Sequence, residues 1–146
     1  NIQEWRNSGG TTLSDVDASG NISSTGSITS SSSSAGIGYE TGAGNTVTQT
    51  GSKSAGVTIN NISGQITTDN AVMNNNAQVS FTVTNSRVEA TDVPVIALSS
   101  GASLDYIISV TNVSNGSFDI LIINTENSSA GDSLVINFAI IKAVSN

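Results

Sequence analysis

The alternation of apolar and polar residues over short stretches constrains the fold of this chain most. Residues 79–84 read Val-Ser-Phe-Thr-Val-Thr, so every second side chain is apolar. A period of two is typical of a β-strand with one buried face. Val and Ile together number 29 against five Leu, and the single Pro leaves strands mostly uninterrupted. Because β-branched residues favour strands over helices, we expect an all-β protein.

Residues 57–146 hold most of the apolar residues and form the predicted domain. Asn115-Gly116 lies between two apolar runs and is a strong signal for a β-hairpin turn. Seven or eight strands with turns at short intervals predict an antiparallel jelly roll or β-sandwich. The expected strands are Val57–Ile59, Gly64–Thr67, Val79–Val83, Val93–Leu98, Leu104–Val113, Phe118–Ile123 and Leu134–Val144.

Residues 1–22 predict two very short strands, Gln3–Trp5 and Thr12–Val16, each followed by a polar turn rich in Gly and Asn. Two short strands bury little surface, and an isolated hairpin is marginal in water. This segment therefore needs partners. Trp5, Leu13 and Val16 are its candidate packing residues, either between copies of the chain or against another structure.

Residues 23–56 are dominated by Ser and Gly, with five consecutive Ser at 30–34. Such a composition is typical of a flexible linker. Apolar residues nevertheless recur at wide intervals, among them Ile28, Ile37 and Val47. Two interpretations stay open, an extended stalk that touches neighbouring chains and a linker without fixed structure.

The last two expected strands carry apolar residues on both faces. Because a strand of a sandwich needs only one apolar face, the second face predicts a further partner. One interpretation is a central strand covered by a loop. The other is a single subunit interface near the end of the chain, formed by Leu121, Ile123, Val135, Ala139 and Ile141.

Composition argues against several functions. The net charge is −7 with four basic residues, which disfavours nucleic acid and anionic membranes as partners. No apolar run is long enough for a transmembrane helix, so we expect no membrane insertion. Without His the chain has no imidazole base or metal ligand, and without Cys it has no thiol nucleophile or thiolate ligand. The sequence predicts a non-enzymatic protein with no catalytic residues, no cofactor and no metal site.

Residues 15–20 read Asp-Val-Asp-Ala-Ser-Gly and begin like a calcium-binding loop. The twelfth position of that loop is Gly26, where calcium loops carry a bidentate Glu. Asp and Ser also start β-turns without any ion, and this is the role that we expect here.

The opening segment resembles a short β-turn repeat that often begins the shaft or anchor of bacteriophage tail fibres. Several regions after Gly44, including 79–83 and 135–143, resemble a C-terminal domain of phage fibre and decoration proteins. The residues that carry the first resemblance are Trp5, Asn7, Ser8, Gly10, Leu13, Val16, Asp17, Ser19, Gly20 and Asn21.

This resemblance implies a homotrimeric virion protein, a tail or head fibre with jelly-roll-like heads on a thin stalk. Its expected location is the surface of the extracellular particle, and its expected partners are its own copies, other virion proteins of the tail or capsid, and a host-surface glycan. Two alternatives stay open. One is a non-catalytic carbohydrate-binding or adhesin module of a bacterial surface protein. Trp5, Tyr39 and Tyr106 are its candidate sugar contacts, although a core or interface role is the favoured interpretation for each. The other is a capsid decoration protein without a receptor role.

Overall fold

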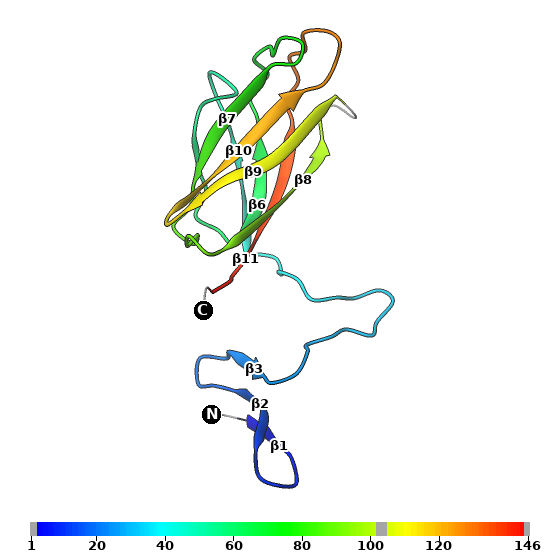
Figure 1. The fold of residues 1–146 in the computed structure, drawn as a ribbon, viewed down its shortest axis with the longest axis vertical. Helices are drawn as coiled ribbons and strands as arrows, with labels where there is room; N and C mark the ends of the chain where they lie inside the picture. Colours follow the sequence, from blue (N-terminus) through cyan, green and yellow to red (C-terminus); the bar gives the residue numbers. More distant parts are fainter. Residues whose placement is uncertain (1–2, 102–104, 145–146) are drawn as a thin grey trace. The chain divides into compact units, whose positions relative to one another are not determined.

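The computed structural model describes residues 3–101 and 105–144, which contain strands and no helix. The chain divides into two compact units, Asn1–Gly38 and Tyr39–Asn146 (Figure 1). The expectation of an all-β protein is therefore confirmed for the described residues.

The N-terminal unit contains one antiparallel sheet in the order β1-β2-β3, formed by Gln3–Arg6, Thr12–Val16 and Ile22–Ser24. The first two strands agree with the prediction. The third lies at the start of the segment that composition assigned to a stalk. Ser and Asn are poor strand formers, and Ile22–Ser24 pairs with β2 because the preceding turn brings it alongside.

The two turns of this sheet repeat one design ten residues apart. The side-chain Oδ1 of Asn7 accepts hydrogen bonds from the N–H groups of Gly9 and Thr11, at 3.0 and 2.9 Å. The Oδ1 of Asp17 accepts from those of Ser19 and Asn21, at 2.8 and 2.9 Å. In both turns the fourth residue is a Gly with φ near +80°, a conformation that other residues rarely adopt.

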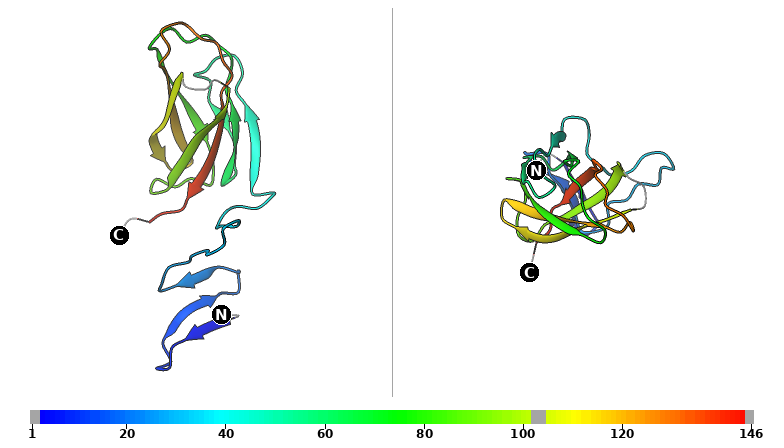
Figure 2. Two further views of the ribbon diagram at one scale, coloured as in Figure 1. Left: turned by 90° about the vertical axis from the view of Figure 1, so that its right-hand side faces the viewer. Right: turned by 90° about the horizontal axis from the view of Figure 1, so that it is seen from above.

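The C-terminal unit contains two four-stranded sheets that share one apolar core, the arrangement of a β-sandwich (Figure 2). In Figure 1 the sheet with β7, β10 and β9 faces the viewer, and β6 and β11 lie behind it. The first sheet has the order β4-β6-β11-β8, with bounds Gly44–Thr48, Ser63–Thr67, Val135–Ile141 and Val93–Ser100. The second sheet has the order β5-β7-β10-β9, with bounds Val57–Thr58, Gln78–Thr84, Ser117–Asn124 and Tyr106–Ser114.

The core follows the alternation seen in the sequence. Phe81 and Val83 of β7 point inward and are almost fully buried, whereas the alternating residues Ser80 and Thr82 are exposed. The rings of Phe118 and Phe138, one from each sheet, lie 5.8 Å apart between their centroids. The remaining fully buried aliphatic side chains come from both sheets and their connections, namely Ile66, Ile120, Ile122, Leu134, Ile136 and Ile140.

The compact unit begins before residue 57, where composition placed the start of the domain. Strand β4 pairs in parallel with β6, and its Val47 packs against the core. The Tyr39 hydroxyl donates a hydrogen bond to the backbone carbonyl of Ile140 at 2.5 Å. Strand β4 is rich in Gly and Thr and shows no alternating apolar pattern. It lies at the edge of its sheet and buries only one or two side chains, so the sequence did not predict it.

Two strand pairs depart from the expected antiparallel arrangement. The consecutive strands β4 to β7 alternate between the two sheets. As a result β4 and β6 are parallel neighbours in the first sheet, and β5 and β7 are parallel neighbours in the second. Parallel neighbours need a long crossover, and residues 49–62 supply one by way of the opposite sheet. The other four pairs of the described sandwich are antiparallel.

The sequence signals for turns and edges agree with the structure. The Asn115-Gly116 turn joins the antiparallel pair β9–β10, and Gly116 has φ +85°. Pro94 is the second residue of β8. Because β8 is an edge strand with a pairing partner on one side only, the N–H that Pro94 lacks is not needed for a central strand pair. Strand β9 begins at Tyr106 in the described residues, and Leu104, where the prediction began it, lies outside them.

Candidate interaction surfaces

The N-terminal sheet has two chemically different faces. The register pairs Val16 of β2 with Ile22 of β3 and with Gln3 of β1. Trp5 follows Gln3 by two residues, so its side chain lies on the same face of the sheet as Val16 and Ile22. We call Trp5, Val16 and Ile22 the apolar face. The opposite face carries Glu4, Arg6 and Asp15, with an ion pair between Arg6 and Glu4.

None of the described residues of this unit, 3–38, forms a layer over the apolar face. Trp5 is 51% exposed and Ile22 is 63% exposed, and no described residue of 3–38 is buried. Leu13, the third predicted packing residue, is the extra residue of a β-bulge between the pairs Trp5–Ser14 and Arg6–Thr12, and it too is exposed. A stable domain needs a second layer against the apolar side of a sheet, which this unit lacks by itself.

The structure does not bring the five predicted interface residues of the sandwich together. Leu121 and Ile123 lie on the outer face of β10, since the alternating residues Ile120 and Ile122 are buried. The other three, Val135, Ala139 and Ile141, lie on the outer face of β11 in the opposite sheet. The prediction of a single patch is wrong for the described structure. These residues form two patches, because the last two strands belong to different sheets.

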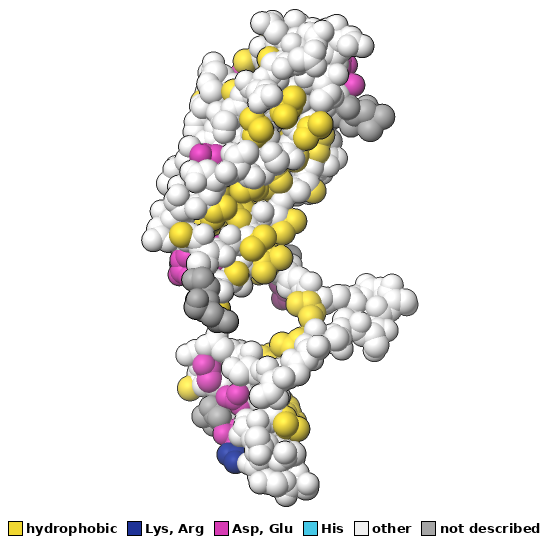
Figure 3. All heavy atoms as spheres, viewed as in Figure 1, with side chains coloured by type: hydrophobic (Ala, Val, Ile, Leu, Met, Phe, Trp, Pro, Cys, Tyr) yellow, Lys and Arg dark blue, Asp and Glu magenta, His cyan; other side chains and the backbone are white. Residues whose placement is uncertain are grey.

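Each of the two patches continues onto a neighbouring edge strand. On the second sheet Ile107 of β9 pairs with Ile123, and it is 55% exposed. We call Ile107, Leu121 and Ile123 the β9–β10 patch. Figure 3 shows this face of the molecule, with hydrophobic side chains gathered over β9 and beside β8.

On the first sheet Val93 pairs with Ile141 and Val95 pairs with Ala139. A shallow hollow of about 200 Å³ lies beside them, and the outward side chains at its lining are Val95, Ala97, Asn137 and Ala139. We call these four residues the β8–β11 hollow, with Val93 and Ile141 at its rim.

Sequence reasoning missed Val93, Val95, Ala97 and Ile107. A usable signal was present, because residues 93–98 read Val-Pro-Val-Ile-Ala-Leu and are apolar at both odd and even positions. The prediction took apolar residues on both faces as a sign of an interface only in the last two strands.

The other half of the sandwich surface is polar. Outward residues of β4, β6 and β7 are Thr, Ser, Gln, Asn and Gly. Several of them bond across strands. Gln65 Nε2 donates to Asn137 Oδ1 at 2.9 Å, and Thr82 Oγ1 donates to Asp119 Oδ1 at 2.7 Å. The exposed apolar residues of the two sheets therefore gather on the half around β8, β9, β10 and β11.

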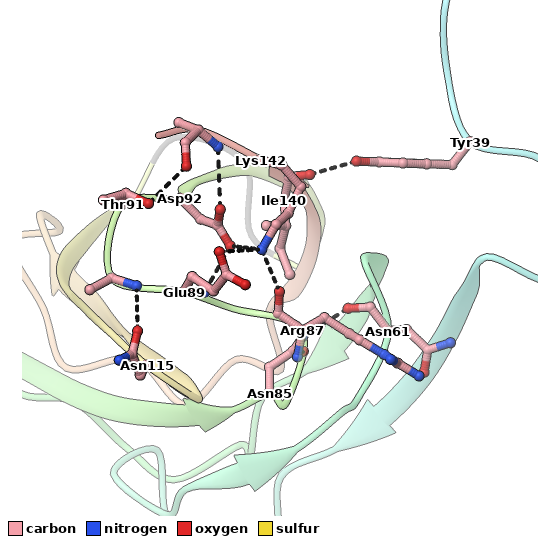
Figure 4. A network of polar contacts seen from close by, with 12 residues as sticks. Tyr39, Asn61, Asn85, Arg87, Glu89, Thr91, Asp92, Asn115, Ile140 and Lys142 are labelled. Atoms are coloured by element: carbon pink, nitrogen blue, oxygen red, sulfur yellow. Dashed lines mark hydrogen bonds and ion pairs between the residues drawn. The ribbon is translucent and has the colours of Figure 1, made fainter. Parts of the chain in front are cut away.

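A polar network holds Lys142 and Ala143, which follow β11, against the sandwich (Figure 4). Lys142 Nζ lies 2.6 Å from Asp92 Oδ2, and it also donates to the carbonyl of Arg87 at 3.1 Å. Burial alone raises the pKa of the Asp92 carboxyl. Hydrogen bonds from Lys142 and from the N–H groups of Glu89 and Ala143 outweigh burial, so this pKa lies below its usual value. The network ends β11 and directs the chain beyond it.

Both tyrosines use their hydroxyls inside the fold. Tyr106 is buried, and its hydroxyl donates to Asp132 Oδ2 at 3.2 Å. Burial, together with the Asp132 carboxylate, raises the pKa of Tyr106 to about 12. Tyr106 therefore has a core role rather than a sugar-binding one, and the Tyr39 hydroxyl is bonded to the Ile140 carbonyl.

Lys53 is buried, and its ammonium donates to the backbone carbonyls of Asp69 and Asp132. Burial lowers the pKa of Lys53, and the nearby Asp69 and Asp132 carboxylates oppose that shift. The side chain of Gln49 bonds the same connection, donating to the carbonyls of Lys53 and Ala55. These contacts tie three connections of the sandwich together.

A second hollow, of about 280 Å³, lies next to Lys53. Its lining includes the hydroxyl and amide side chains of Ser52, Ser54, Asn74 and Gln78, and it holds no aromatic residue. Hydroxyls and amides suit neutral polar ligands, whereas a sugar site usually adds an aromatic platform.

Within the described residues, no group of three or more acidic, His or Cys side chains is placed to hold a metal ion. Asp17 has the predicted turn role. Hydrogen bonds from the Asn21 side chain and backbone lower the pKa of its carboxyl. In the same part of the chain, no helix has the length and apolar character needed to cross a membrane. No known protein family, curated protein or solved structure matches this chain.

Proposed function

We propose that the protein is a non-enzymatic structural component of a virion, a homotrimeric phage tail or head fibre exposed on the particle surface. The observation that carries the proposal is the N-terminal sheet, whose apolar face has no covering layer among the described residues of its own unit. Three copies of an amphipathic sheet bury that face in a shared core and leave Glu4, Arg6 and Asp15 in water. Trp5, Leu13 and Val16 then pack between chains or against the particle.

The second support is the distribution of apolar residues on the sandwich. A monomeric soluble protein rarely gathers its exposed apolar side chains on one half of its surface. Here the exposed apolar side chains of the two sheets gather around β8–β11, and polar residues of the other half bond across strands. This is the pattern of a subunit with one side toward its own copies and the other toward water.

The oligomeric state is tested by mass photometry and chemical cross-linking of the full chain. The proposal expects trimers at micromolar concentration, and a stable monomer there would refute it. A label at position 1, located on intact particles by electron microscopy, separates a tail fibre from a head fibre or decoration protein. Absence of the label from particles would contradict a virion role.

The hollow beside Lys53 favours a second candidate function, a carbohydrate-binding or adhesin module. Its Ser52, Ser54, Asn74 and Gln78 side chains suit a neutral glycan of the host surface. Binding to a glycan array that Asn74→Ala and Gln78→Ala together abolish supports this role, either for a module of a surface protein or for the tip of a fibre. No binding to any glycan leaves a structural or decoration role without receptor contact.

A further inference from the structure

The two apolar surfaces of the sandwich differ in shape. The β9–β10 patch presents three bulky side chains, with Ile107 projecting furthest at 55% exposure. The β8–β11 hollow is shallow, with a volume of about 200 Å³, and its outward residues are the smaller Val95, Ala97 and Ala139 together with Asn137. Bulky side chains on one surface complement a hollow on the other, as closely packed interfaces require.

The two surfaces adjoin along one edge of the molecule. Strands β8 and β9 are edge strands of their sheets and lie beside each other (Figure 1). The outer surface therefore turns from one sheet to the other across this edge. A contact between one surface of a copy and the other surface of the next copy is heterologous, and such contacts form a ring when the rotation between copies closes.

Charge favours a second copy of this chain as the occupant. Neither surface includes a charged side chain, although each chain carries a net charge of −7. The one charged residue of β10, Asp119, and Lys142 just after β11 are engaged within the fold. Asp119 accepts from Thr82 and Asn112, and Lys142 binds Asp92. Two copies therefore meet here without placing like charges against each other.

Area favours a ring over a pair. Each surface is two strands wide and about three to five residues long, which corresponds to about 100 to 170 Å² in projection. A stable complex buries about 800 Å² per partner, so one such contact alone is too small. A ring engages both surfaces of every copy, and the apolar face of the N-terminal sheet adds to the buried area.

We propose that the β9–β10 patch of one copy seats in the β8–β11 hollow of the next, which gives a heterologous contact that closes as a ring of three. This inference rests on the proposed homotrimer and specifies the surfaces that build it. It places Ile107, Leu121 and Ile123 against Val95, Ala97 and Ala139 of the neighbouring copy, with Val93 and Ile141 at the rim.

The absence of Cys from the natural sequence makes the contact testable by engineered cross-linking. Leu121→Cys and Ala139→Cys lie on central strands, away from the β8–β9 edge, so equivalent residues of a ring are far apart. With a short bis-maleimide, the double variant should give covalent dimers and trimers and nothing larger. Each single variant should stay uncross-linked, and so should the control pair Thr48→Cys with Leu121→Cys, because Thr48 lies on the polar half.

The outcomes separate the inference from the proposed function. In one outcome mass photometry finds trimers, and a single variant cross-links as much as the double variant. That result would show a contact between equivalent residues and overturn the inference. Trimers in which the double variant does not cross-link would also overturn it, and in both cases the proposed homotrimer would stand. A ladder beyond three chains contradicts the closed ring. A full chain that is monomeric refutes the homotrimer itself.

Discussion

The substitution Ile141→Asp tests whether the rim of the β8–β11 hollow lies in a subunit contact. Ile141 is 56% exposed in the single chain, and its neighbour across the strand pair, Val93, is 50% exposed. The side chain makes no contribution to the core between the sheets. A carboxylate there leaves the fold of one chain intact, and its effect falls on assembly.

The magnitude follows from the exposed area. Burying an Ile side chain completely stabilises by about 1.5 to 3 kcal/mol, so covering the exposed half contributes about 1 to 1.5 kcal/mol per chain. Over three chains the loss is about 4 kcal/mol, which weakens assembly about a thousand-fold. Desolvation of the new carboxylate adds to this loss.

Mass photometry over a dilution series measures the shift in the midpoint of dissociation. The matched control is Thr48→Asp, which places the same charge on the polar half of the first sheet and should leave the midpoint unchanged. If Ile141→Asp and Thr48→Asp dissociate at the wild-type concentration, Ile141 does not lie at a subunit contact.

Three further predictions concern the fold. Phe138→Ala removes a buried ring that packs against Phe118, and we expect the free energy of unfolding in urea to fall by about 4 kcal/mol. A drop below 1 kcal/mol would contradict the core described above. Asp92→Asn removes the charge paired with Lys142 and should cost about 2 kcal/mol near neutral pH. Because the pKa of Asp92 is lowered in the fold, that difference should fade as pH drops below about 3.8, and a constant difference in acid melts would argue against the pairing. The pKa of Tyr106 is raised to about 12 in the fold, so its contribution is complete below pH 10 and lost as pH rises through 12. Thermal melts of Tyr106→Phe should lack this alkaline loss, and an unchanged profile would exclude Tyr106 as its source.

Local patterns predicted the individual strands well. The alternation in residues 79–84 and the Asn115-Gly116 turn depend only on neighbours in sequence, and both agree with the structure. The parallel pairing of β4 with β6 depends on contacts between distant residues, and the Gly- and Thr-rich β4 has no periodic signal of its own.

The candidate interface shows the same limit. The apolar doubling of the last two strands correctly placed Leu121, Ile123, Val135, Ala139 and Ile141 on outward faces. It could not place them on one surface or two, because that depends on which sheet each strand joins. Ile107 and Val95 belong to these surfaces because their edge strands, β9 and β8, pair with β10 and β11.

The fluorescence of Trp5 tests the central claim most directly. Trp5 is the only Trp of the chain and lies on the apolar face of the N-terminal sheet, 51% exposed in the single chain. Acrylamide quenching is measured at a concentration where mass photometry finds trimers, and again after dilution. The account predicts blue-shifted, poorly quenched emission in the trimer, and red-shifted, readily quenched emission after dissociation. Trp5 that is equally quenched in both states would contradict the claim that copies of this chain cover the apolar face of one another.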